Sequence, residues 1–215
     1  MSAPYDVARV DELESFPGPG TLRWRPIRRR FGLTAFGINA YTADEAGRDV
    51  VEEHTEETYG HEEVYVVVAG RATFTLAGET FDAPTGTIVV IRDPKTKRHA
   101  AAAEPGTTVL AVGGRPGAHD PSAWEWSFAA YGYHQQGDTE RGVAELREAL
   151  EAGLKPDTRA RLLYDLACLE CLAGRGGETA VGYLLEAVEL DPKYRKFASD
   201  DSDLDVIRDD PRFPR

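Results

Sequence analysis

The chain has 215 residues, of which 41% are hydrophobic and 29% are charged. This composition fits a folded protein of one large or two small domains, and it excludes a disordered tail. The net charge of −12 argues against a general nucleic-acid binder, because phosphate contacts require a basic surface.

Neither a membrane-spanning helix nor a secretory signal is expected. The longest apolar runs, such as residues 64–69, fall far short of the roughly 20 residues that span a bilayer, and the first residues lack a basic region followed by an apolar one. Cys168 and Cys171 cannot form a disulfide framework. We therefore expect a cytoplasmic protein without a membrane or nucleic-acid partner, and interpret both cysteines as core residues of a helix.

The first half of the chain predicts β-strands. Short runs rich in Val, Ile, Thr and Tyr alternate with turn residues. We expect strands at about 22–28, 33–41, 48–55, 62–69, 71–76, 79–82, 87–92, 97–103 and 107–113. Their regular spacing, without a helical pattern between them, predicts an antiparallel β jelly-roll.

An arginine cluster lies near the start of this half, at Arg23, Arg25 and Arg28–Arg30. It could bind an anionic substrate or an acidic partner surface. Alternatively, it is the exposed face of an edge strand that charge protects from aggregation, and we favour that interpretation.

Two spacings within the predicted strands form a motif pattern. Glu63 is followed seven residues later by Gly70, and Pro94 precedes His99 by five residues. This pattern resembles the two motifs of the cupin superfamily, and the resemblance covers residues 34–114. It implies a barrel that binds a small molecule, and in many members a metal ion.

The histidines depart from the family pattern. A His-x-His pair would fall at residues 56–59, but the chain has His54 and His61 on either side of that stretch. Because side chains alternate along a strand, His61, Glu63 and Tyr65 share one face. His54 ends the preceding strand, and the resemblance puts His99 in a ligand position.

We therefore expect a divalent transition metal (Fe, Mn, Ni or Zn) bound by ligands with nitrogen and oxygen atoms. The predicted metal ligands are His54, His61, Glu63 and His99. Glu63 would be the fourth ligand or a general base, and Tyr65 an acid in the cavity, so both are candidate catalytic residues. A polar cavity without metal and a vestigial barrel are the alternatives. The neighbouring carboxylates, including Glu56, are interpreted as a solvated loop.

The second half of the chain predicts helices. Pro121 and Ser122 resemble a helix start, and Asp138 resembles the N-cap of a second helix. Further helices are expected over 157–173 and 178–190, and a short one around 204–208. The expected fold class is thus α+β, with a cupin-like barrel domain over residues 1–116 and an all-α domain over residues 117–215.

A repeat runs through the predicted helices. Leu146 and Leu184 are separated by 38 residues, and similar residue pairs follow each of them. The segment 122–193 resembles the tetratricopeptide repeat family, although Gly142 stands where the family prefers Ala. Two repeats are fewer than the three that usually form a stable stack, so the final helix, the barrel or another subunit must cap them, and we expect the barrel to do so. The whole chain also resembles bacterial proteins that join a cupin-like barrel to a short tetratricopeptide segment.

Two functions are consistent with these features. The first is a metal-dependent cupin enzyme, an oxygenase or isomerase that binds a small molecule in its barrel. The alternative is a non-catalytic ligand-binding or scaffold module whose helical half docks a protein partner or self-associates. Val64, Val66 and Val68 make the outer face of their strand apolar, so either the helical half or the second subunit of a homodimer is expected to cover it.

Overall fold

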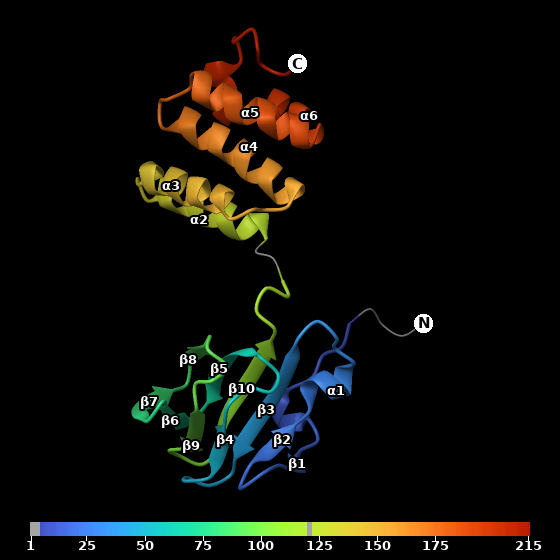
Figure 1. Cartoon of the computed structure of the whole chain (residues 1–215), viewed down its shortest axis with the longest axis vertical. Helices are drawn as coiled ribbons and strands as arrows, with labels where there is room; N and C mark the ends of the chain where they lie inside the picture. Colours follow the sequence, from blue (N-terminus) through green and yellow to red (C-terminus); the bar gives the residue numbers. More distant parts are fainter. Residues whose placement is uncertain (1–4, 120–121) are drawn as a thin grey trace. The chain divides into compact units, whose positions relative to one another are not determined.

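The computed structural model describes residues 5–119 and 122–215 (Figure 1). Backbone contacts divide the chain into two compact units, one ending at His119 and the other formed by the rest of the chain. We refer to them as the β-unit and the helical unit. The predicted helix start at Pro121 lies outside the described residues. Within the described ranges, we find no helix that has both the length and the apolar character needed to cross a bilayer.

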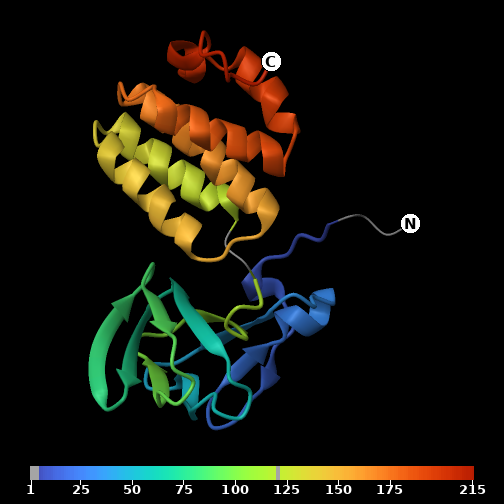
Figure 2. The same cartoon turned by 45° about the horizontal axis from the view of Figure 1, so that its top comes forward.

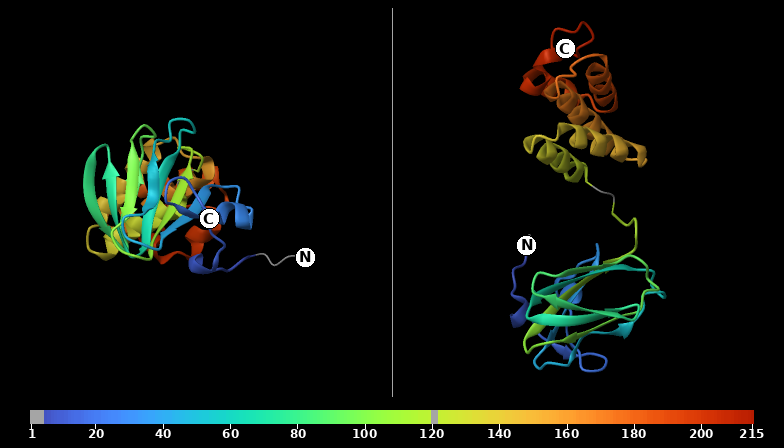
Figure 3. Two further views of the ribbon diagram at one scale, coloured as in Figure 1. Left: turned by 90° about the horizontal axis from the view of Figure 1, so that it is seen from below. Right: turned by 90° about the vertical axis from the view of Figure 1, so that its left-hand side faces the viewer.

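The β-unit contains two antiparallel sheets, preceded by a 3-10 turn, η1 (Val10–Glu12). The six-stranded sheet comprises, in spatial order, β1 (Phe16–Pro17), β2 (Arg23–Arg25), β3 (Gly37–Ala43), β10 (Thr107–Gly114), β5 (Glu62–Ala69) and β8 (Ile88–Ile91). The four-stranded sheet comprises β4 (Asp49–His54), β9 (Arg98–Ala102), β6 (Arg71–Leu76) and β7 (Glu79–Pro84). The right-hand view of Figure 3 shows the strands curving around a common interior.

The strand order is that of a jelly roll. Counted from β3, the first, eighth, third and sixth strands form one sheet, and the second, seventh, fourth and fifth form the other. The predicted β jelly-roll is therefore confirmed. Alternation places Tyr65 and Val67 of β5 in the core between the sheets, where they are buried with Phe74 of β6. Gly70 turns the chain from β5 to β6, and a Cβ there would lie 2.6 Å from Thr107 Oγ1.

The helical unit contains α2 (Ala123–Gln135), α3 (Thr139–Glu151), α4 (Pro156–Leu172), α5 (Glu178–Leu190), α6 (Lys193–Asp200) and the 3-10 helix η2 (Ser202–Ile207). Figure 2 shows α2 packed with α3 and α4 packed with α5. The predicted caps are present: the Ser122 backbone N–H donates to Glu125 at 3.1 Å, and Asp138 accepts from the Arg141 backbone N–H at 3.2 Å. The assignment to the tetratricopeptide family stays a prediction.

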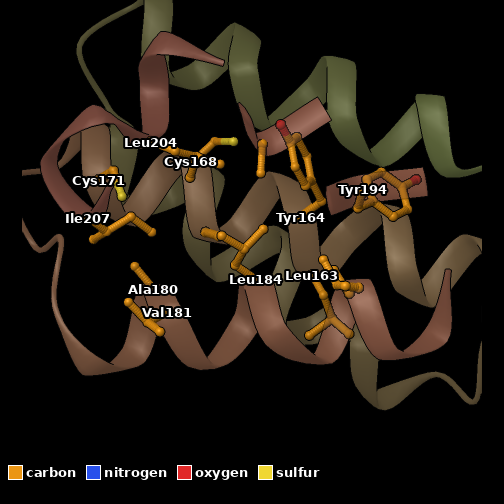
Figure 4. Packing of buried hydrophobic residues seen from close by; sticks show 14 of the residues in the cluster. Leu163, Tyr164, Cys168, Cys171, Ala180, Val181, Leu184, Tyr194, Leu204 and Ile207 are labelled. Carbon is orange, nitrogen blue, oxygen red and sulfur yellow. The ribbon is translucent and has the colours of Figure 1, made fainter. Parts of the chain in front are cut away.

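The core of the helical unit includes its C-terminal segment. Tyr194 of α6 stacks on Tyr164 of α4 with ring centroids 4.9 Å apart, and Leu204 and Ile207 cover the same cluster (Figure 4). Cys168 and Cys171 are buried, free thiols in α4, as predicted. The helix pair α2–α3 packs closely at Gly142, where a Cβ would lie 2.5 Å from the Ala130 carbonyl oxygen. This contact explains why the position holds a glycine.

One predicted strand was too long, and two helices were not predicted. The strand expected at 22–28 ends at Arg25, since Pro26 has no N–H for a sheet ladder. The next residues form the short helix α1 (Ile27–Phe31), which ends at Gly32 with φ 66°. Arg28–Arg30 therefore lie on this helix and not on an edge strand. Sequence reasoning also missed α6, whose N-cap is Pro192.

Candidate functional site

A cavity of about 880 Å³ opens between the two sheets of the β-unit. Its walls come from β3, β4, β5 and β10, from the β4–β5 turn, and from the segment around α1. The polar and aromatic lining residues include Trp24, Arg28, Arg29, Asn39, Tyr41, His54, Glu56, His61, Glu63 and Tyr65. The volume and the mixed lining are those of a small-molecule site.

Glu63 is the centre of a hydrogen-bond network in this cavity. Its Oε2 accepts from the Tyr65 hydroxyl at 2.5 Å and from Arg98 Nη1 at 2.8 Å. Glu63 and Tyr65 are two residues apart on β5, so they share the face that points inward. Burial by itself raises the pKa of Glu63, but His54, the Tyr65 hydrogen bond and the Arg98 charge outweigh it and lower the pKa below its usual value. Burial raises the pKa of Tyr65, so the phenol stays protonated.

Arg98 is the unexpected member of the network. Its side chain is fully buried, and it also donates to the Thr96 carbonyl oxygen at 2.9 Å. Sequence reasoning missed this residue, because arginine is almost never fully buried without a partner and its partner lies on a distant strand. The buried guanidinium compensates the Glu63 charge.

His54 presents one ring nitrogen to the acidic residues. Nδ1 lies 2.7 Å from the Glu52 carbonyl oxygen, which can only accept, so Nδ1 carries the proton of that bond. Nε2 then faces the cavity, 3.6 Å from Glu56 Oε1 and 3.8 Å from Glu63 Oε2. The Glu63 carboxylate raises the pKa of His54 above its usual value, despite the opposing effect of burial.

Glu56 and His61 lie on the turn between β4 and β5. The Glu56 backbone N–H donates to the Pro94 carbonyl oxygen at 2.8 Å, which holds the turn over the cavity. Glu56 Oε2 is buried without a hydrogen-bond partner, although His61 Nδ1 is 3.2 Å away. Sequence reasoning assigned Glu56 to a solvated loop. The missed signal was its place in the window where the family carries its paired histidines.

His99 does not join the other predicted ligands. On β9 the buried residues are Arg98, Ala100 and Ala102, so alternation turns His99 to the outer face of its sheet. There its Nε2 lies 2.9 Å from Asp49 Oδ1. His99 therefore does not face the cavity as expected. The residue of β9 that points inward is its neighbour Arg98.

Of the predicted ligands, His54 and Glu63 join Glu56 in a possible metal-ligand group, and the predicted ligand His61 is not a member of it. Ligand atoms of His54, Glu56 and Glu63 all lie within 4.8 Å of one another. Imidazole and carboxylate donors suit Fe, Mn, Ni or Zn, the metals expected from the sequence. The Glu56 oxygen without a hydrogen-bond partner and the Nε2 of His54, which faces the cavity, fit such an ion. Arg98 opposes it, because the guanidinium already compensates Glu63.

Comparison with known proteins gives likenesses of fold. No family model and no curated protein matches the chain. Among solved structures, it is similar to a cupin protein from Bacteroides fragilis, with 19% identity over 56% of this chain and 92% of that chain and a TM-score of 0.43. It is also similar to a sugar phosphate isomerase of the cupin superfamily from Silicibacter pomeroyi, with 15% identity over 51% of this chain and 76% of that chain and a TM-score of 0.42. KdgF from Halomonas sp. is 19% identical over 48% of this chain and 86% of that chain, with a TM-score of 0.40. Because these TM-scores are low, the jelly-roll assignment rests on the strand order described above.

Proposed function

We propose that the β-unit is a cupin-type barrel that binds a small polar molecule beside a divalent transition-metal ion held by His54, Glu56 and Glu63. The observation that carries this proposal is the convergence of these three side chains in one cavity, with Glu56 Oε2 buried and without a hydrogen-bond partner. When bound, the ion supplies Lewis-acid chemistry that polarises a carbonyl or hydroxyl oxygen of the molecule.

The protein side chains supply acid–base chemistry at the same place. Glu63 has a lowered pKa and is ionised at neutral pH, so it can accept a proton. Tyr65 stays protonated and already donates to Glu63, so its hydroxyl can hydrogen bond to a substrate oxygen. A base that can take a proton from one atom and return it to the next, beside a hydrogen-bond donor, favours an isomerase over an oxygenase, since an isomerase moves a proton between neighbouring atoms.

Arg98 favours a second candidate, a barrel that binds its ligand without metal. The ion pair of Glu63 and Arg98 is complete at 2.8 Å, and the Tyr65 hydrogen bond closes the network. In that case the cavity would hold its ligand through hydrogen bonds alone. This candidate corresponds to the non-catalytic ligand-binding module that the sequence left open. A measurement of metal content separates it from the first proposal.

The experiment is a measurement of metal per chain on protein purified without a chelating tag, after incubation with Fe, Mn, Ni or Zn. We expect about one equivalent of one ion for a single site. Glu56→Gln should lower the affinity at least tenfold, whereas the exposed neighbour Glu57 serves as the control, with Glu57→Gln unchanged. His99→Ala should also retain the metal. No bound metal with any ion would contradict the first proposal and leave the metal-free barrel.

The helical unit carries a surface that fits a protein partner. Trp124 and Phe128 of α2 are exposed, with their rings edge to face and centroids 5.8 Å apart. They lie on a groove of about 830 Å³ that also includes Tyr131, Arg161 and Lys193. Exposed aromatic pairs of this kind mark interaction sites. This groove supports the proposal of a protein partner or self-association, which sedimentation of the Trp124→Ala variant against the parent chain would test.

The β-unit carries an apolar surface that supports a homodimer. Val68 of β5 and Ile88 and Val90 of β8 are exposed, and β8 is the edge strand of its sheet. Unpaired edges and apolar faces favour pairing with a second copy. An Ile88→Lys substitution should convert a dimer to a monomer in sedimentation equilibrium, and a monomeric parent chain would contradict the proposal.

A further inference from the structure

The cavity is electrostatically two-sided. His54, Glu56 and Glu63 form its acidic part, whereas Arg28 and Arg29 line it from α1. Both arginines are exposed, so they stand at the mouth of the cavity. The chain as a whole carries a net charge of −12, so a cluster of cations beside a cavity is an exception to its acidic character.

In the part of the chain that the structure describes, the two arginines form no ion pair. Among the described residues, no carboxylate lies within ion-pair distance of either guanidinium, whereas exposed arginines elsewhere, such as Arg48 and Arg71, are paired with Glu45 and Asp82. Their charge is therefore available to a ligand.

The local structure holds Arg28 in place at the mouth. The helix α1 contacts β3 and ends at Gly32, and the Leu33 N–H closes the last turn by donating to the Arg28 carbonyl oxygen at 3.1 Å. Arg28 Nε donates to the Leu33 carbonyl oxygen at 3.2 Å, which leaves its two Nη groups for other acceptors. The helix and its neighbouring strands are seen at the right of the β-unit in Figure 1.

Two aromatic residues line the cavity between its mouth and the acidic part. Trp24 lines the cavity, and its indole N–H donates to Asn39 Oδ1 at 2.9 Å, which fixes the ring. Tyr41 lies on the inner face of β3, toward the acidic residues. Aromatic side chains are common in the lining of small-molecule pockets, where they can contact a ring of the bound molecule.

We propose that the molecule bound in the barrel is a small organic anion. Its carboxylate or phosphate group contacts Arg28 and Arg29 at the mouth, and its hydroxyl or carbonyl end reaches His54 and Glu63. Guanidinium groups bind both kinds of oxyanion in the same way. This inference rests on the proposed function, because it names the substrate class of the same cavity.

The test compares three probes that share one ring: glucose 6-phosphate, glucuronate and glucose. Dissociation constants are measured by NMR titration of the full-length protein. We expect at least one anion to bind about tenfold more tightly than glucose, the difference that about 1.4 kcal/mol gives. The preferred anion distinguishes a phosphate ligand from a carboxylate ligand. The Arg28→Ala/Arg29→Ala double variant should lose the preference.

Arg30→Ala is the matched control. It removes the same charge from the same helix, but Arg30 does not line this cavity and instead lies over the Phe31 ring. Equal binding of all three probes, including no binding by any of them, would overturn the inference. It would also be overturned if Arg30→Ala lost the preference for an anion as fully as the double variant. Binding that depends on Glu63 but not on the two arginines overturns only the substrate class. The proposed function has its own readout, the metal content.

Discussion

Replacing Arg98 by methionine tests the network at the centre of the site. Arg98 is fully buried and lies 2.8 Å from Glu63 Oε2. Removing one partner of a buried ion pair leaves the other charge uncompensated, which costs about 3–5 kcal/mol. Glu63 keeps the Tyr65 hydrogen bond, and 12% of its side chain is exposed, so we expect the lower end, about 3 kcal/mol, for Arg98→Met.

The assay is urea unfolding followed on the amide signals of β5 in the presence of a chelator. Signals of this strand report the β-unit alone, which matters because a chain of two units need not unfold in one step. Arg92→Met is the control, since Arg92 is exposed and should change the free energy of unfolding by less than about 0.5 kcal/mol.

A double variant, Glu63→Gln with Arg98→Met, removes both charges. It should recover most of the lost free energy, since replacing a buried ion pair as a whole is often nearly neutral. The reasoning is refuted if Arg98→Met alone costs less than about 1 kcal/mol, or if the double variant is less stable than the single one.

Three further predictions concern titration, packing and thiol reactivity. In metal-free protein, NMR should place the pKa of His54 above its usual 6.5, and Glu63→Gln should lower it; the resulting stabilisation is present below pH 6.5 and is lost as the pH rises through the folded-state pKa. Gly142→Ala should lower the free energy of unfolding by about 1 kcal/mol, because its Cβ meets a backbone carbonyl of α2. Gly182→Ala has open space around it and should raise the free energy of unfolding by up to about 1 kcal/mol. Thermal unfolding measures both variants, and changes of the same sign would show that packing is unimportant. Burial raises the pKa of Cys171 to about 11, so a thiol reagent at pH 8 should label it only after unfolding, and rapid labelling of folded protein would contradict the core assignment.

Local patterns were sufficient to predict most of the elements. Strands such as β5 and β6 follow from alternation bounded by turn residues, and they lie at the expected residues 62–69 and 71–76. The helix over 178–190 was also predicted at its observed bounds. The bounds of these strands and of this helix depend on residues that are close together in the chain, so the local sequence is enough to predict them.

The failures in the site are of a different kind. The motif spacing pointed to His99, but a difference of one residue along a strand reverses the face, and only the register of β9 shows that Arg98 points inward. Glu56 looked like a solvated loop charge, because its burial depends on a turn that bonds to the distant Pro94. Both facts arise from contacts between segments that are far apart in the chain.

The jelly-roll order also affects how the chain acquires its structure. β3 pairs with β10, so Ala40 and Leu110 are partners across a separation of 70 residues, and β10 also lies beside β5 at the centre of the sheet. By contrast, α2 packs on the helix that directly follows it. Because distant pairings must close large loops before they gain contacts, the β-unit should fold more slowly than the helical unit. During synthesis, the six-stranded sheet cannot close until the residues up to Gly114 have left the ribosome, and until then β3 and β5 each lack their central neighbour.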